Sequence, residues 1–295
     1  MTFSEINNVA VICTKDRQIE LFKILQNLET QVEKFFKIIV IDSSKISFFS
    51  SSDIRFSGID FYQTSPGLTH QRNFGLTKIP GNSNFCHFFD DDVVLDDAYL
   101  LNFNKYIEEN SDIRIATGRQ KIKAPSNFFR LFTRITNLSG KLLSNGINIS
   151  PNYFNLTDCT ELEWMPGCNM IIAYGLIANG NVYFDELNRT GYSMGEDVDI
   201  SVKLRSYGKI LYLPNCVYTH NLSINNRMDE IQKYLEFLKH RYLLTRDYPE
   251  KFNTNIFFLS IRVELILFTF LYFFTKKRHF KSWGEAIRIF RNKTI

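Results

Sequence analysis

The triplet Asp90-Asp91-Asp92 follows an apolar run at residues 84–89 and is the strongest candidate for chemistry in the sequence. Three negative charges at the end of a buried strand cost free energy unless a cation or hydrogen-bond donors compensate them. Ligands that are all oxygen select a hard ion such as Mg²⁺ or Mn²⁺, which usually bridges to substrate phosphates. The alternative is an acidic turn that caps the next helix.

A second acid, Asp42, also ends a β-branched run. In an open α/β sheet, ligands bind at the carboxyl ends of the strands, near the point where the strand order reverses. We therefore expect Asp42 and the triplet to face one crevice. Taken alone, Asp42 would equally be a solvated turn aspartate that bonds to Ser43 or Ser44.

The third acidic segment, Gly195-Glu196-Asp197-Val198-Asp199, opens a predicted helix. A carboxylate in the first turn, with a glycine before it, can face a pocket and take a proton from a hydroxyl group. The alternative is ordinary pairing of acids with the helix dipole. Arg17 and Arg72 supply positive charge for an anionic ligand, since arginine binds phosphate through two hydrogen bonds. Each arginine alone is more often a surface salt-bridge residue.

The elements that must position these residues alternate between short β-branched runs and longer helical patterns, as in a parallel sheet with crossover helices. We expect strands at 9–13, 37–42, 59–62, 84–89, 113–118, 170–173 and 210–213. We expect helices at 17–31, 96–109 with an acidic start, 128–143 and 196–207, and one that carries Arg72 and Asn73 after the turn Pro66-Gly67. The helix at 128–143 has one apolar face, formed by Leu131, Ile135, Leu138 and Leu142. This face could pack in the core, or it could contact a lipid or a partner. Residues 45–58 are expected to form an irregular connection, and His220 to follow the last strand.

Six segments resemble, in order, the motifs of family 2 glycosyltransferases. They lie at 11–17, 41–44, 66–75, 90–92, 164–170 and 191–200. The segment at 66–75, Pro-Gly-Leu-Thr-His-Gln-Arg-Asn-Phe-Gly, is similar to the family's Gly-Leu-Ser-x-Ala-Arg-Asn-x-Gly, and the triplet occupies the family's DxD position. Lys15 and Asp16 depart from the family's Tyr and Asn, which leaves the nucleobase contacts open.

The resemblance implies a GT-A fold, a Rossmann-like mixed sheet flanked by helices, over residues 1–225. It implies transfer of a sugar from a nucleotide-diphosphate sugar with inversion at the anomeric carbon. We expect the acceptor to be a hydroxyl of a glycan or polyprenyl-linked molecule in bacterial surface polysaccharide synthesis. The resemblance also implies Mn²⁺ or Mg²⁺ as cofactor. Carried over residue by residue, it places Thr14, Arg17 and Asp42 around base and ribose, Arg72 near the nucleotide, and Asp90 and Asp91 against ribose and diphosphate. It makes Asp92, with Asp90 and His220, the metal ligands, Asp197 the base, and Glu196 a residue that orients the acceptor.

Other classes fit the residues less well. A sugar nucleotidyltransferase would need a glycine-rich phosphate loop after the first strand, where residues 13–17 contain no glycine. A phosphatase of the Asp-x-Asp type would carry its acids where Thr14 stands. The non-enzyme alternative is a catalytically degenerate transferase that acts as a binding or scaffold subunit of a polysaccharide assembly complex, against which the intact Asp92 and Asp197 weigh.

Positive charge is concentrated at the end of the chain. The 295 residues carry a net charge of +4, of which residues 276–295 contribute +6, so residues 1–275 are slightly acidic. A nucleic-acid-binding protein would spread its positive charge over the body of the domain, so nucleic acid is not an expected partner. With no CxxC pair among five cysteines and no signal-like run at the start, we expect a reduced, cytoplasmic protein.

Aromatic residues are concentrated in the same region, within an apolar run at 256–274 that contains Arg262 and Glu264. We expect residues 226–295 to form a helical membrane-associating region with helices at 228–248, 256–274 and 283–290, the last lying on a surface. The run at 256–274 could just span a bilayer, but its two charges make spanning costly. An interfacial helix beside Lys276-Lys277-Arg278, peripheral on the anionic inner face of the cell membrane, is favoured. A core helix packed on the catalytic domain is the alternative.

Overall fold

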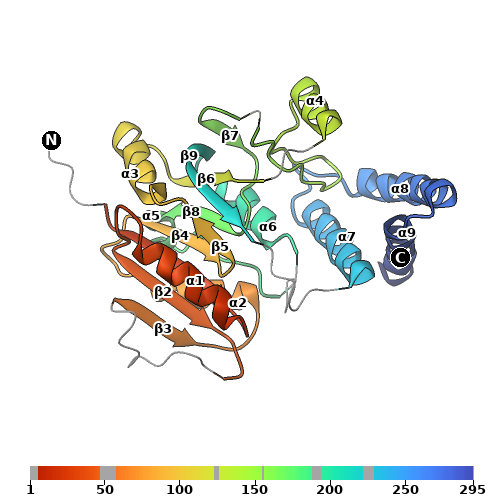
Figure 1. The fold of residues 1–295 in the computed structure, drawn as a ribbon. Helices are drawn as coiled ribbons and strands as arrows, with labels where there is room; N and C mark the ends of the chain where they lie inside the picture. The colour runs from red at the N-terminus through yellow and green to blue at the C-terminus, as the bar shows by residue number, and fades with distance from the viewer. Residues whose placement is uncertain are drawn as a thin grey trace. The chain divides into compact units, whose positions relative to one another are not determined.

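The computed structural model describes residues 6–46, 58–122, 126–154, 156–187, 194–221 and 229–294, and the chain forms two compact units (Figure 1). The first, called the sheet unit, comprises Met1–Lys141, Ser150–Tyr192 and Glu196–Ser223. The second, called the helical unit, comprises Leu142–Ile149, Ser193–Gly195 and Ile224–Ile295.

The first half of the sheet is parallel, as the sequence predicts. Its strands are β1 (Asn8–Thr14), β2 (Lys37–Asp42), β3 (Ile59–Gln63) and β4 (Phe85–Asp90), in the order β3-β2-β1-β4. The crossover helices are α1 (Gln18–Glu29) and α2 (Leu68–Leu76). Alternate residues of β1 enter different core clusters: Ala10 and Ile12 lie with the buried face of α1, and Val9 and Val11 lie in the second cluster. The strands therefore read as continuous apolar runs because both of their faces are covered.

The second half of the sheet is mixed. The further elements are β5 (Val93–Leu95), α3 (Tyr99–Glu109), β6 (Ile115–Gln120), α4 (Asn127–Thr136), β7 (Thr160–Leu162), β8 (Asn169–Ala173), α5 (Tyr174–Ala178), α6 (Glu196–Leu204) and β9 (Ile210–His220). β8 runs antiparallel to β4 and β6, while β9 is parallel to β6 and antiparallel to β5 and β7. This mixed sheet with flanking helices confirms the predicted α/β fold class.

Two helix predictions in the sheet unit need correction. α3 begins at Tyr99, so the acidic start expected at residues 96–97 precedes the helix; the N–H of Asp96 instead donates to the carbonyl of Val217, beside the β5–β9 pairing. α4 ends at Thr136, because Asn137 takes a positive φ of 53°. On α4, Leu131 and Ile135 are 57% and 73% exposed, so their face is not core. The side chains of residues 128 and 129 lie outside the described residues.

The sequence predicts that His220 follows the last strand, but in the structure His220 is the last residue of β9. The strand continues through Pro214, and its register against β6 shifts between Gly118 and Arg119. A Cβ atom on Gly118 would overlap the carbonyl oxygen of Cys216, so this irregular pairing requires glycine there. The longer strand carries His220 to the same edge as Val93, its partner on β5.

The helical unit contains α7 (Glu230–Asp247), α8 (Thr254–Thr275) and α9 (Arg278–Thr294). Asp229 caps α7 and Asn253 caps α8 through their side-chain oxygens. The three helices bury a common cluster: Leu238, Phe257, Ile261, Ala286, Ile287 and Phe290. The expectation that the last helix lies on a surface is wrong for Ile287 and Phe290, which face this core. Residue 228, the predicted start of α7, lies outside the described residues.

Candidate active site

The acidic segments of the sheet unit meet at one edge of the sheet. In the strand register, Thr14 pairs with Asp42 and Cys13 pairs with Asp90, so the carboxyl ends of β1, β2 and β4 are level. Asp91 and Asp92 continue from Asp90 in the turn towards β5. The predicted crevice therefore has its acids where a parallel sheet places its ligands.

Asp91 holds the segment after β1 against the triplet. Thr14 Oγ1 donates to Asp91 Oδ2 at 2.7 Å, and Arg17 Nη1 donates to Asp91 Oδ1 at 2.9 Å. Arg17 Nη1 also lies 3.5 Å from Asp92 Oδ2. Burial raises the pKa of Asp91 to about 6, against the opposing effects of Thr14 and Arg17. Asp91 thus positions two side chains that the family resemblance assigns to the nucleotide.

Asp42 is buried but forms the turn that was the alternative interpretation. Its Oδ1 accepts hydrogen bonds from the N–H of Ser44 at 2.8 Å and from Ser44 Oγ at 2.5 Å. Gln71, on α2, ties the same region together, because its Nε2 donates to the carbonyls of Thr14 at 2.9 Å and Ile41 at 2.8 Å. Gln71 was not predicted as a site residue, and its place within the segment at 66–75 was its sequence signal.

Arg72 connects the triplet with α6. This guanidinium is buried, with Nη1 at 3.0 Å from Glu196 Oε1 and Nη2 at 3.5 Å from Asp90 Oδ1. Nη2 also donates to the carbonyl of Gly167 at 3.0 Å, and the group lies 5.4 Å from the centre of the Phe184 ring. Burial would lower the pKa of Arg72, but the adjacent Glu196 and Asp90 carboxylates raise it, so the side chain stays charged. Neither Gly167 nor Phe184 was predicted as a site residue.

Asp197 has the properties of a group that exchanges protons near neutral pH. Its Oδ2 accepts the N–H of Gly167 at 3.0 Å, and its Oδ1 accepts the N–H of Val198 at 2.8 Å. Burial and the nearby Glu196 carboxylate raise the pKa of Asp197 to about 7. A general base works best when its pKa lies near the operating pH. Residues 191–193, which precede this segment in the matching motif, lie outside the described residues.

Three residues of the edge form a group that could hold a metal ion: Asp90, Asp92 and His220, whose ligand atoms all lie within 4.8 Å of one another. His220 Nε2 lies 2.9 Å from Asp92 Oδ1 and 3.8 Å from Asp90 Oδ2. Burial would lower the pKa of His220, but its hydrogen bond to Asp92 and the charge of Asp90 help raise it to about 11. Two carboxylates and an imidazole fit a divalent cation, and the nitrogen donor suits Mn²⁺ better than Mg²⁺.

All ten sequence-predicted site residues therefore lie at this edge. Hydrogen bonds and ion pairs run from Thr14 and Arg17 through the triplet to His220 and Arg72, and from Arg72 to Glu196. Gly167 joins Asp197 to Arg72 through its backbone N–H and carbonyl. Asp42 joins the group through the strand register and Gln71. One polar network thus connects the residues assigned to donor, metal and base.

The mixed sheet with flanking helices is similar to the GT-A fold of glycosyltransferases in solved structures. One is GalNAc-T7 with UDP, GalNAc and Mn²⁺ (13% identity, TM-score 0.59, 75% of this chain and 44% of that chain). Another is Staphylococcus aureus TarS 1–349 in complex with UDP-GlcNAc (14% identity, TM-score 0.51, 98% and 92%).

A longer structure of S. aureus TarS matches with 15% identity and a TM-score of 0.50, over 81% of this chain and 44% of that chain. The chain thus spans less than half of the GalNAc-T7 chain and of the longer TarS chain. No protein-family model and no curated protein matches the sequence. At these identities the likeness establishes the fold, and the reaction has to be inferred from the site.

Proposed function

We propose that the chain is an inverting glycosyltransferase that moves a sugar from a nucleotide-diphosphate sugar to a hydroxyl group of a glycan or polyprenyl-linked acceptor. The observation that carries the proposal is the polar network at the sheet edge, in which a metal-ligand group and a carboxylate with a pKa of about 7 are joined through Arg72. Transfer from a diphosphate needs compensation of negative charge on the leaving group and a base for the acceptor, and the network offers both.

The donor side of the site is formed by Thr14, Arg17, Asp42 and Asp91, with Asp90 and Asp92 beside them. Asp90, Asp92 and His220 would hold the divalent cation, which would stabilise the negative charge of the leaving diphosphate. Mn²⁺ and UDP are present in the GalNAc-T7 structure, and UDP-GlcNAc in TarS 1–349. These neighbours support a UDP-sugar as the first donor to test.

On the acceptor side, Asp197 would take the proton of the attacking hydroxyl group. The oxygen forms a bond to the anomeric carbon while the bond to the diphosphate breaks, and the proton moves to Asp197 Oδ. A single displacement of this kind inverts the anomeric carbon. Glu196, held by Arg72 at 3.0 Å, would orient the acceptor. Analysis of the product's anomeric configuration by NMR tests the inversion, and a retained configuration contradicts it.

We place the reaction in bacterial surface polysaccharide synthesis, with residues 1–225 as the catalytic domain and residues 226–295 as a membrane-associating region. The support for the location is α8, which is long and apolar enough to cross a membrane and is mostly unburied. A cytoplasmic enzyme that is peripheral on the inner face of the membrane would meet a polyprenyl-linked acceptor there.

The experiment that tests the proposal is a thermal-shift panel of UDP-, GDP- and dTDP-sugars, each with and without Mn²⁺, followed by a transfer assay. We expect one nucleotide class to raise the melting temperature, and to do so more strongly with Mn²⁺. Stabilisation by no nucleotide sugar would contradict the proposal. Binding without turnover against a broad acceptor panel would favour a degenerate transferase that serves as a binding or scaffold subunit.

A further inference from the structure

One side of α8 presents a continuous apolar stripe to its surroundings. Its residues are between 43% and 72% exposed: Ile256, Leu259, Val263, Ile266, Leu267, Phe270, Phe273 and Phe274. At about 100° per residue they cover roughly a third of the helix circumference. We call this set the α8 stripe. A contiguous apolar surface of this kind marks a binding site for a partner or a membrane.

The opposite side of α8 is fixed inside the helical unit. Phe257 and Ile261 are fully buried in the common cluster with α7 and α9. Arg241 of α7 is also fully buried, and its Nη1 and Nη2 donate to the two carboxylate oxygens of Glu264 at 3.0 and 2.9 Å. Nη2 donates in addition to Ser260 Oγ at 2.8 Å. The polar residues of α8 on this side are therefore engaged by α7.

These contacts exclude a membrane-spanning α8 as long as the unit stays folded. A helix that crosses the bilayer alone would have to separate from α7. The separation would leave Arg241 as an uncompensated buried charge and would move Glu264 into the hydrocarbon of the membrane. Breaking a buried ion pair in this way is strongly destabilising, and charges at the bilayer centre are costly. α8 can offer only its stripe, from outside, as an in-plane helix does.

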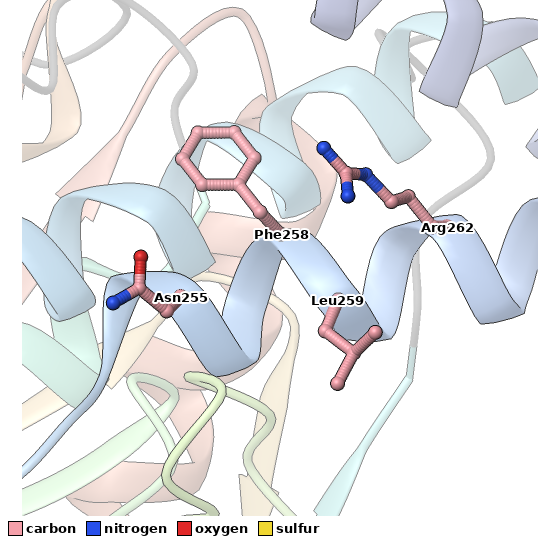
Figure 2. Close-up of a pocket in the computed structure, with 4 residues that line it drawn as sticks. All are labelled: Asn255, Phe258, Leu259 and Arg262. Atoms are coloured by element: carbon pink, nitrogen blue, oxygen red, sulfur yellow. The ribbon is translucent and has the colours of Figure 1, made fainter.

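Basic residues beside the α8 stripe indicate an anionic partner. Lys276, Lys277, Arg278 and Lys281 are exposed where α8 ends and α9 begins. On α8, Arg262 lines a hollow of about 330 Å³ with Asn255, Phe258 and Leu259 (Figure 2). Figure 2 shows the Arg262 guanidinium clear of the α8 backbone, and the side chain is exposed, so its long stem can carry the charge to a membrane interface. A second copy of the chain packed with its α8 parallel would bring these like charges together, whereas an anionic lipid surface complements all of them.

We infer that the helical unit docks on an anionic lipid bilayer with α8 parallel to the membrane plane, the α8 stripe among the acyl chains and the basic residues at the headgroups. The inference rests on the membrane location proposed above and specifies how the membrane is met. Apolar burial and electrostatic attraction then act together, which makes binding dependent on both stripe and salt.

The test is flotation of the full chain with phosphatidylcholine vesicles, with and without phosphatidylglycerol. We expect binding to the anionic vesicles and release at about 1 M salt, where the Debye length falls to about 3 Å. The double variant Ile266→Ser, Phe270→Ser and the double variant Lys277→Glu, Arg278→Glu should each bind at least tenfold more weakly. The matched controls are Leu187→Ser, which changes an 89% exposed leucine of the sheet unit, and Lys105→Glu on α3; both should bind as the unchanged protein does.

Three results would overturn the inference. The first is unchanged vesicle binding by the stripe variant while circular dichroism reports native folding. The second is retention on vesicles after both salt and alkaline carbonate washes, which indicates a spanning helix. The third is self-association of the unchanged protein without vesicle binding, together with a monomeric stripe variant. A sugar-transfer assay on a soluble acceptor is independent of all three, so loss of docking and failure of the proposed reaction are distinguishable.

Discussion

Gly167 donates its backbone N–H to Asp197 Oδ2 at 3.0 Å, and the same residue accepts a hydrogen bond from Arg72 through its carbonyl. One glycine residue, through its two adjacent peptide groups, therefore bridges the proposed base and the arginine that reaches the triplet. A Cβ atom at Gly167 would lie 3.1 Å from Glu196 Oε1, 3.2 Å from Arg72 Nη2 and 3.2 Å from Asp197 Cβ. Arg72, Glu196 and Asp197 can thus lie this close together because residue 167 is a glycine and has no side chain.

Gly167→Ala should lower kcat by about tenfold or more, because the new methyl group pushes the Arg72–Glu196 pair and Asp197 apart, and small misplacements of catalytic groups are costly. Steady-state kinetics measure the effect. The control is Gly175→Ala on α5, where a Cβ atom meets nothing within 4 Å and activity should be unchanged. Equal kinetics for the two variants would show that the spacing at Gly167 does not matter for turnover.

Asp197→Asn should reduce kcat by about 10²–10⁴-fold, the usual contribution of a general base, and leave donor binding intact. Transfer kinetics and a thermal shift with the nucleotide sugar measure the two quantities separately. Asp199→Asn is the matched control, since Asp199 lies in the same helical turn but pairs with Lys203 at 2.8 Å. Wild-type turnover in Asp197→Asn would show that Asp197 is not the general base.

The pH dependence of kcat should follow the same carboxylate. Because the pKa of Asp197 is raised to about 7, a base that must be ionised is mostly inactive below that pH. We expect log kcat to rise with pH up to about 7 and then to level off. A flat profile between about pH 5 and pH 8 is incompatible with Asp197 as the titrating base.

Stability should change with pH in the opposite direction. Asp197 has a folded-state pKa of about 7 against an ordinary value of 3.8, so between these values the folded chain binds more protons than the unfolded chain. The contribution of Asp197 to the free energy of unfolding therefore falls as pH rises through this window. Asp197→Asn should raise the melting temperature at pH 8 more than at pH 5, by differential scanning calorimetry. A pH-independent difference would mean that the pKa is not raised.

The proposed metal ligands Asp92 and His220 can be tested by metal binding alone, without an assay of sugar transfer. Asp92→Asn should weaken Mn²⁺ binding at least tenfold, because it removes a charged ligand. His220→Asn should weaken Mn²⁺ more than Mg²⁺, because the nitrogen donor matters for Mn²⁺ and little for Mg²⁺. Isothermal titration with each metal salt measures both. His279→Asn, at an exposed histidine of α9, is the control and should leave both affinities unchanged.

The parallel half of the sheet could be predicted because β1, β2 and β4 are continuous apolar runs bounded by polar residues. β5, β7 and α5 are three to five residues long, which is too short for a periodic pattern to show. The extension of β9 was missed because Pro214 normally ends a strand, whereas here an irregular register beside Gly118 accommodates it.

The carboxylates of the candidate site were predictable because their position follows from the ends of the strands. The contribution of Gly167 was not, since a backbone N–H has no signature in sequence. Phe184 acts through a tertiary contact with Arg72, which no local pattern reveals. Gln71 lies in the matching segment at 66–75, but its hydrogen bond to Ile41 shows only in the structure. The surroundings of the face that carries Leu131 stayed open in the sequence for a related reason: periodicity indicates an apolar face but not what covers it.

Gly195 has a φ of +83°, and a Cβ atom on it would overlap the ring of His240 on α7. It belongs to the helical unit, as does Leu142–Ile149, where the carbonyl of Ser144 accepts the N–H of Asn253. The helical unit is thus assembled from three separate stretches of chain, two of them internal to the sheet unit's sequence. A stop codon near residue 225 would leave those two stretches without their packing partners, so the sheet unit is not a ready-made module for separate expression or for grafting onto another anchor.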